Sequence, residues 1–189
     1  MKRKWSVTKL MATGSLAVLT LVFQLAGAGI AAATGVPLTS GLINVFVSPA
    51  MLVLCLLVVD QVGVATIYMT VLGVLQLPLP LTGIPGFLPK VLILLVIGVL
   101  VDVVCVLLRR TRLIASLVIG GLDMFLAGLG TVEIGRLFGM PGVEQAADLF
   151  YSPIGIVGAL VGGAIGGLVG WLIYSRIRNS TVVVRIQGE

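Results

Sequence analysis

Residues 91–108, VLILLVIGVLVDVVCVLL, decide the fold class of this chain. They form a long apolar run that contains a single charged residue, Asp102. Arg109 and Arg110 close the run, whose length is typical of a helix that crosses a lipid bilayer. The whole chain of 189 residues is similar, with 59% hydrophobic residues, 10% charged residues and a mean hydropathy of +1.23. A soluble domain needs far more charge to cover its surface, so we expect an all-α membrane protein.

Six apolar runs divide the chain, and we expect each to form one transmembrane helix of a single bundle. Their approximate bounds are 10–33, 42–59, 62–77, 91–108, 113–131 and 154–174. The third run is short, since 16 residues rise about 24 Å as a helix, against about 30 Å for the hydrocarbon core. Residues 175–189 follow as a short cytoplasmic tail, so residues 1–189 are expected to form one transmembrane domain.

The lysines and arginines predict the orientation of the bundle. With the N-terminus inside, ten of the twelve fall on the inner side, and only Lys90 and Arg136 fall outside. Cytoplasmic loops carry such an excess of positive charge, so both termini are expected in the cytoplasm of a multi-pass cell-membrane protein. Because the basic residues flank apolar runs, the net charge of +5 indicates topology and a lipid bilayer, not a nucleic-acid partner.

The start of the chain also allows a second interpretation. Lys2, Arg3 and Lys4 precede an apolar stretch that ends in small residues, as in a secretory signal peptide. The apolar stretch is longer than that of most signal peptides, so an uncleaved first helix is the preferred prediction.

Several classes of chemistry have no residues to support them here. The sequence has no histidine, which excludes histidine metal sites and histidine general bases. Cys55 and Cys105 lie within apolar runs without CxxC spacing, so we interpret them as buried thiols. The chain also lacks a Walker A motif, so any ATP hydrolysis must come from partners. We therefore predict no catalytic residue, metal or cofactor.

The last apolar run carries Gly158, Gly162, Gly166 and Gly170 at four-residue steps. This spacing places the four glycines on one face of a helix, where a neighbouring backbone can approach closely. Membrane helices depend on such contacts, because lipid gives them no hydrophobic drive to associate. The neighbour is either another span of this chain or a second protein, and the sequence leaves both open.

Ionisable residues within the runs are costly in lipid and indicate pairing or function. Asp102 lies seven residues before Arg109 on the same helical face, so we expect a structural pair with Arg109 or Arg112. Asp60 ends the second run and is interpreted as interfacial. Asp123 lies near the middle of the fifth run, with no basic residue nearby in sequence. It is expected to be protonated, paired across the bundle, or in contact with a ligand.

Polar residues also gather at the expected outer ends of the runs. The connection formed by residues 77–90 is apolar and rich in proline, as in a lid or in a loop lying among lipid headgroups. Ligand sites in helix bundles combine an apolar cavity with a few polar groups. The candidate substrate contacts, chosen by position, are Gln24, Asn44, Gln76, Asp123, Glu133 and Tyr151.

The chain resembles the substrate-binding S components of energy-coupling factor transporters. The likeness rests on size, six runs, a first run rich in small residues, the segment GVPLTSGLIN at 35–44, the lid-like connection, and a glycine-rich last run followed by SRIR. It implies a non-enzymatic protein that captures a vitamin or other micronutrient from outside, with a membrane T subunit and two cytoplasmic ATPases as partners. Thr13 and Ala17 match only a looser form of the family's docking motif.

Two other functions remain open on the residues alone. One is a structural or assembly membrane protein without a small ligand, whose interface would be the glycine-rich face of the last run. The other is a membrane enzyme that acts on lipid through Asp102 and Asp123. A small molecule that co-purifies with the protein would favour the transport hypothesis over both.

Overall fold

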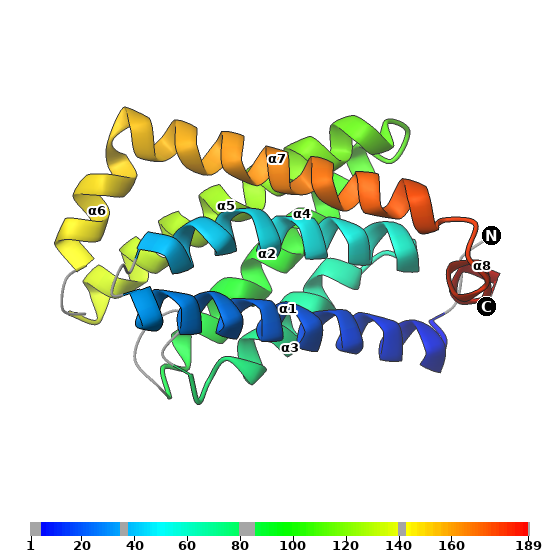
Figure 1. The fold of residues 1–189 in the computed structure, drawn as a ribbon, viewed down its shortest axis with the longest axis horizontal. Helices are drawn as coiled ribbons and strands as arrows, with labels where there is room; N and C mark the ends of the chain where they lie inside the picture. The colour runs from blue at the N-terminus through cyan, green and yellow to red at the C-terminus, as the bar shows by residue number, and fades with distance from the viewer. Residues whose placement is uncertain (1–4, 35–37, 80–85, 140–142, 189) are drawn as a thin grey trace.

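A computed structural model describes residues 5–34, 38–79, 86–139 and 143–188, and for residues 38–42 it describes the backbone alone. Within these residues the chain is all-helical and has no strand. The helices are α1 (Val7–Thr34), α2 (Leu38–Val59), α3 (Val64–Leu75), α4 (Pro89–Leu107), α5 (Arg112–Leu137), α6 (Val143–Tyr151), α7 (Pro153–Ile177) and α8 (Thr181–Gly188). Figure 1 shows the long helices running roughly alongside one another, with α6 at one end of the bundle and α8 at the other.

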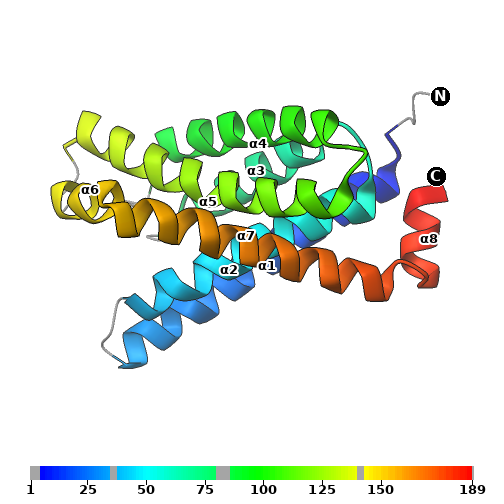
Figure 2. The ribbon, with the colours of Figure 1, turned by 90° about the horizontal axis from the view of Figure 1, so that it is seen from above.

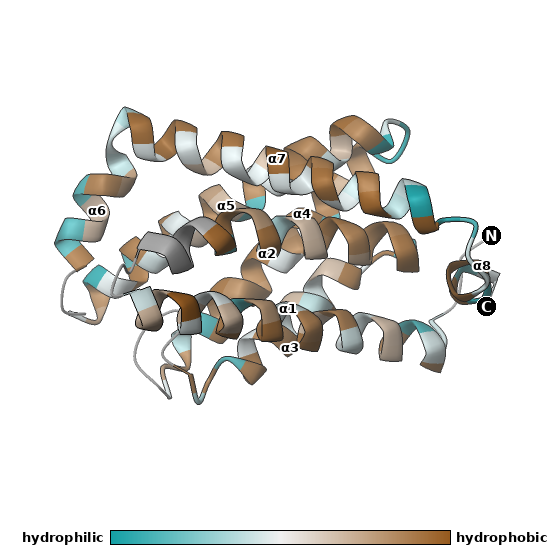
Figure 3. Cartoon of the chain, in the orientation of Figure 1, coloured by the Kyte–Doolittle hydropathy of each residue, from teal (hydrophilic) through white to brown (hydrophobic). Residues whose placement is uncertain are grey.

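Four of these helices, α1, α4, α5 and α7, are long and apolar enough to cross a membrane. Two shorter apolar stretches, Ile43–Val59 of α2 and Val64–Leu75 of α3, accompany them. Large apolar side chains lie on the outside, such as Ile154 at 83% and Val7 at 73% exposure. Figure 3 shows hydrophobic residues along the length of the long helices. This apolar exterior fits a protein that is surrounded by lipid.

The helices follow the expected runs with three differences. α3 has 12 residues where the run has 16, because it begins only after Gly63, whose φ of 91° suits glycine. α5 continues beyond its expected end at 131 to Leu137. α6 and α8 lie outside the six runs, and α8 occupies most of the expected tail, where Val183 and Ile186 are buried.

α7 lies between α2 and α5, and its glycines allow both contacts. A Cβ added to Gly166 would lie 2.5 Å from Pro49 Cγ of α2. A Cβ added to Gly163 would overlap the carbonyl oxygen of Gly120 on α5. Among the described residues, no side chain or backbone of another element lies within 4 Å of such a Cβ at Gly158. The glycine-rich face is therefore packed against other spans of this chain, which was one of the two predicted possibilities.

α3 and α4 form a second close pair. A Cβ added to Gly98 of α4 would lie 2.7 Å from Thr66 Cα and 2.8 Å from the carbonyl oxygen of Ala65. These distances are too short for any side chain, so the first turn of α3 lies directly against the backbone of α4. The apolar core lies beside this pair, where Leu52 of α2 and Tyr68 of α3 are fully buried.

The two termini lie at the same end of the bundle, where α8 packs beside the start of α1 (Figures 1 and 2). We call this the basic end, because α4, α5 and α7 direct Arg109, Arg112 and Arg176 toward it. The opposite end, which carries α6, is called the α6 end. Figure 2 shows the α6-end halves of α1 and α2 diverging from α5 and α7.

Candidate functional site

Buried polar side chains from α1, α3 and α4 meet in the α6-end half of the bundle. Gln76 Nε2 donates a hydrogen bond to Gln24 Oε1 at 2.7 Å, and both side chains are buried. Lys90 Nζ donates to the carbonyl oxygens of Gln76 and Leu79 at 2.7 and 3.0 Å. The ammonium group thus lies at the C-terminus of α3, where carbonyls lack helical partners and positive charge is favoured. Two predicted contacts, Gln24 and Gln76, therefore touch each other.

A second polar group lies between α2 and α5. Asp123 is 1% exposed, and its Oδ2 accepts a hydrogen bond from Ser48 Oγ at 3.3 Å. No lysine or arginine pairs with Asp123 in the part of the chain that the structure describes. Asn44 precedes Ser48 by one helical turn, and its buried Oδ1 has no hydrogen-bond partner among the described residues. Asn44 and Ser48 share one face of α2, so the predicted contacts Asn44 and Asp123 belong to one region.

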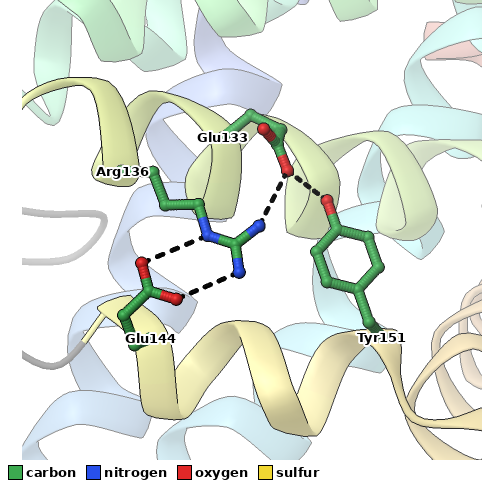
Figure 4. A network of polar contacts seen from close by, with 4 residues as sticks. All are labelled: Glu133, Arg136, Glu144 and Tyr151. Carbon is green, nitrogen blue, oxygen red and sulfur yellow. Dashed lines mark hydrogen bonds and ion pairs between the residues drawn. The ribbon is translucent and has the colours of Figure 1, made fainter.

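The other two predicted contacts, Glu133 and Tyr151, lie in an exposed network with Arg136 and Glu144 (Figure 4). Arg136 donates to both oxygens of Glu144 at 3.0 and 3.3 Å, and to Glu133 at 3.5 Å. The Tyr151 hydroxyl donates to Glu133 Oε1, and Arg136 Cζ lies 5.6 Å from the centre of the Tyr151 ring. The bond to the Glu133 carboxylate raises the pKa of Tyr151 above 10.0, because it favours the protonated hydroxyl.

Local packing and capping position this network. The ring of Phe150 lies against Gly128 of α5, where a Cβ would overlap it. Ser152 then begins α7 as an N-cap, since its Oγ accepts a hydrogen bond from the amide of Gly155 at 3.0 Å. The aromatic contact and the cap together fix α6 across the end of α5. At this exposed position the Tyr151 hydroxyl and the Glu133 carboxylate are hydrogen-bonded to each other.

The predicted pair between Asp102 and Arg109 or Arg112 is wrong. The Asp102 carboxylate instead accepts hydrogen bonds from the amides of Ala65 and Thr66 at 3.1 and 2.9 Å, and from Thr66 Oγ1 at 2.6 Å. The reason is that α3 begins after a glycine and has no side chain of its own to cap its free amides. A carboxylate from α4 takes that role and also matches the positive end of the helix dipole.

Asp60 is the acidic neighbour of those arginines. Its carboxylate lies 3.9 Å from Arg109 Nη2 and 3.8 Å from Arg112 Nη2. Arg112 also donates to the Tyr174 hydroxyl at 3.3 Å, and Gln187 of α8 donates to the same oxygen at 3.3 Å. Asp60 therefore joins the end of α2 to the α4–α5 turn, which goes beyond the interfacial role predicted for it.

The hollows at the basic end differ in size. One of about 360 Å³ lies between the start of α3 and the last part of α4, beside Asp102 and Thr66, and its other lining residues are almost all apolar. Two hollows beside Asp60 each have a volume of about 40 Å³, which is little more than a water molecule occupies. Within the described residues, no group of three or more His, Cys, Asp or Glu side chains could hold a metal ion.

Comparison with known proteins leaves the function open. The family profile described as the GLUG motif matches residues 155–187, which cover most of α7 together with most of α8. This match spans less than a fifth of the chain and follows its glycine-rich part, so it assigns the whole chain to no family. No curated protein and no solved structure matches the chain.

Proposed function

We propose that this chain is the substrate-capture subunit of an importer of the energy-coupling factor type. It would bind a vitamin or another micronutrient at the outer side of the cell membrane, for ATP-driven uptake by partner subunits. The observation that supports this best is the placement of four predicted contacts. Gln24, Gln76, Asn44 and Asp123 come from four helices, and all four carry buried polar atoms in a bundle with an apolar exterior. Such a combination is typical of ligand sites within helix bundles.

The proposed topology has six spans with both termini in the cytoplasm. The two ends of the chain lie at the same end of the bundle, which requires an even number of crossings. The basic residues at that end agree with a cytoplasmic location under the positive-inside rule. α2 and α3 supply the two crossings beyond the four long helices, with α3 stopping short of the surface.

In the proposed mechanism, the micronutrient enters at the α6 end, and the outer connections close over it. The predicted lid, residues 77–90, lies partly outside the described residues, as does the first outer connection. The T subunit and the ATPases would dock at the basic end and drive reorientation of the loaded bundle. The chain itself performs no chemistry in this proposal.

The alternative, an assembly protein without a small ligand, has less support. Its interface was predicted to be the glycine-rich face, and Gly162, Gly166 and Gly170 of that face pack against α2 of the same chain. An assembly role would therefore need another surface.

Native mass spectrometry of the purified protein tests the proposal, followed by thermal-shift assays with a broad micronutrient panel. We expect a small molecule bound in a one-to-one ratio, and a compound in the panel that raises the Tm. Asn44→Leu should abolish this binding while the protein stays folded, because Asn44 Oδ1 has no partner to lose. Gln145→Leu on α6 is the matched control, since this glutamine is exposed. A protein that binds no compound in the panel would refute the proposal.

A further inference from the structure

The interface between α2 and α5 points to a further site, because the acceptor oxygens of Asp123 and Asn44 have few hydrogen-bond partners there. Asp123 receives one hydrogen bond among the described residues, from Ser48, and Asn44 Oδ1 receives none. Asn44 lies one helical turn before Ser48 on the same face of α2. One turn of α2 thus presents an amide oxygen and a hydroxyl on the side that faces this buried carboxyl.

No charged neighbour balances this carboxyl. Helices α2, α4, α6 and α7 pack against α5. Their titratable or charged groups, together with Tyr68 of α3, are Cys55 of α2 with Asp60 directly after that helix, Lys90, Asp102 and Cys105 of α4, Glu144, Asp148 and Tyr151 of α6, and Tyr174 and Arg176 of α7. None of them makes a hydrogen bond or ion pair with Asp123 within the described residues. Lys90 and Asp102 are engaged with the two ends of α3. Asp123 therefore needs another source of positive charge.

Physical chemistry limits what that source can be. An isolated carboxylate inside a bundle costs several kcal/mol, so the group holds either a proton or a bound cation. An anion is disfavoured here, because the ionisable group of this site, Asp123, is either neutral or negatively charged. A divalent ion prefers several carboxylates, and this interface has one. A monovalent cation carries the single positive charge that one carboxylate can balance, and the side-chain oxygens of Asn44 and Ser48 offer it further ligands.

We propose that Asp123, Asn44 and Ser48 form a binding site for a monovalent cation, either an alkali ion or the ammonium head of a small amine. In the empty site Asp123 carries a proton and is neutral. Binding breaks the O–H bond of the carboxyl, releases the proton to solution and leaves the carboxylate paired with the cation. The exchange conserves the charge of the buried site. It goes beyond the proposed importer function and holds whether or not that function is correct.

The test uses the purified full-length protein in detergent, with sodium, potassium and methylammonium chlorides as probes. N-methylglucamine chloride at equal ionic strength serves as the reference, because its cation is too large for a site between two packed helices. We expect at least one probe to raise the Tm saturably and to release about one proton per protein into a weakly buffered indicator solution. A response to sodium or potassium alone identifies an alkali-ion site, and a response to methylammonium alone identifies an amine site.

Two variants connect the signals to this interface. Asp123→Asn keeps the shape of the side chain and removes its charge, so it should fold and lose both the Tm shift and the proton release. Asp148→Asn, at an exposed position on α6, should keep both signals. If Asp123→Asn does not fold, Asn44→Leu replaces it, and we expect at least a tenfold loss of apparent affinity. No signal from any probe in the wild-type protein, or unchanged signals in these α2 and α5 variants, would overturn the proposal.

Discussion

Asp102 and Asp123 are both buried carboxyl groups in long apolar helices, yet their surroundings are opposite. Asp102 accepts three hydrogen bonds from the first turn of α3. Asp123 accepts one, from a serine hydroxyl. Their exposures of 8% and 1% would rank Asp123 as the more structural group. The number of accepted hydrogen bonds separates them better than burial does, because Asp102 uses three of the roughly four acceptor positions of a carboxylate and Asp123 uses one.

The geometry of α3 and α4 explains why Asp102 accepts three hydrogen bonds. α4 carries two charges twelve residues apart, Lys90 and Asp102, and α3 is itself 12 residues long. Both spacings correspond to a rise of about 18 Å, so the two charges of α4 meet opposite ends of α3. Asp102 lies at its N-terminus and Lys90 at its C-terminus, each where the helix dipole favours it. Between α2 and α5 an ion pair forms at the basic end, where Asp60 lies 3.8 Å from Arg112, and Asp123 is not part of it.

The largest effect should come from separating α3 and α4. Gly98→Leu would push the α4 backbone away from Thr66 and remove Asp102 from the amides that it caps. We expect a loss of at least about 4 kcal/mol of stability, or no folded protein, as for severe overpacking with loss of a buried polar contact. Gel filtration and thermal unfolding in detergent measure this. Gly158→Leu is the control, because the space beside Gly158 is open. Equal stability of the two variants would contradict the packing described for Gly98.

The direct comparison of the two carboxyl groups should give the next largest effect. Asp102→Asn replaces one acceptor by a donor and leaves an amide of α3 unpaired, which should cost about 2–4 kcal/mol. Asp123→Asn changes a carboxyl group that accepts a single hydrogen bond and should alter stability by less than about 1 kcal/mol. Thermal unfolding of both variants in the same detergent checks the order. If Asp123→Asn were the more damaging change, Asp123 would be the structural group.

Lys90→Met removes the charge from the other end of α3. The carbonyls of Gln76 and Leu79 lose their donor, and we expect a cost of about 1–2 kcal/mol. Hydrogen exchange should show faster opening of the last turn of α3, while the first turn stays protected by Asp102. Lys90→Arg, which keeps a donor and a charge, should lose less. Uniform exchange along α3 in Lys90→Met would contradict separate capping of the two ends.

Much of this fold could be predicted from sequence, because long apolar runs and glycine spacing are local signals. The apolar residues of 91–108 suffice for a helix, and the four-residue glycine steps suffice for a close-packed face. α6 and α8 were missed because each is short and interrupts its apolar residues with polar ones. Their positions depend on contacts such as Phe150 with Gly128, which no local pattern contains.

Partners across the bundle were harder to predict than elements. The Asp102–Arg109 pair followed from spacing on one helix, and the open amides of α3 offered a better partner from another helix. The available signal was the glycine before α3, which predicts a helix start without a cap of its own. For the contact between Gln24 and Gln76, the sequence offered one indication, which is that both residues lie near the same expected level of the membrane.

The smallest effect concerns the exposed network, where solvent weakens every charge interaction. Glu133 raises the pKa of Tyr151 above its ordinary value of 10.0. The contact therefore stabilises the folded protein fully below pH 10.0. This stabilisation is lost as the pH rises through the pKa that Tyr151 has in the folded protein. Absorbance titration of a protein with Tyr68→Phe and Tyr174→Phe isolates Tyr151. We expect its midpoint to lie above 10.0 and to fall toward that value in Glu133→Gln. Asp148→Asn should leave the midpoint in place. An unchanged midpoint in Glu133→Gln would mean that the hydroxyl does not bond this carboxylate in solution.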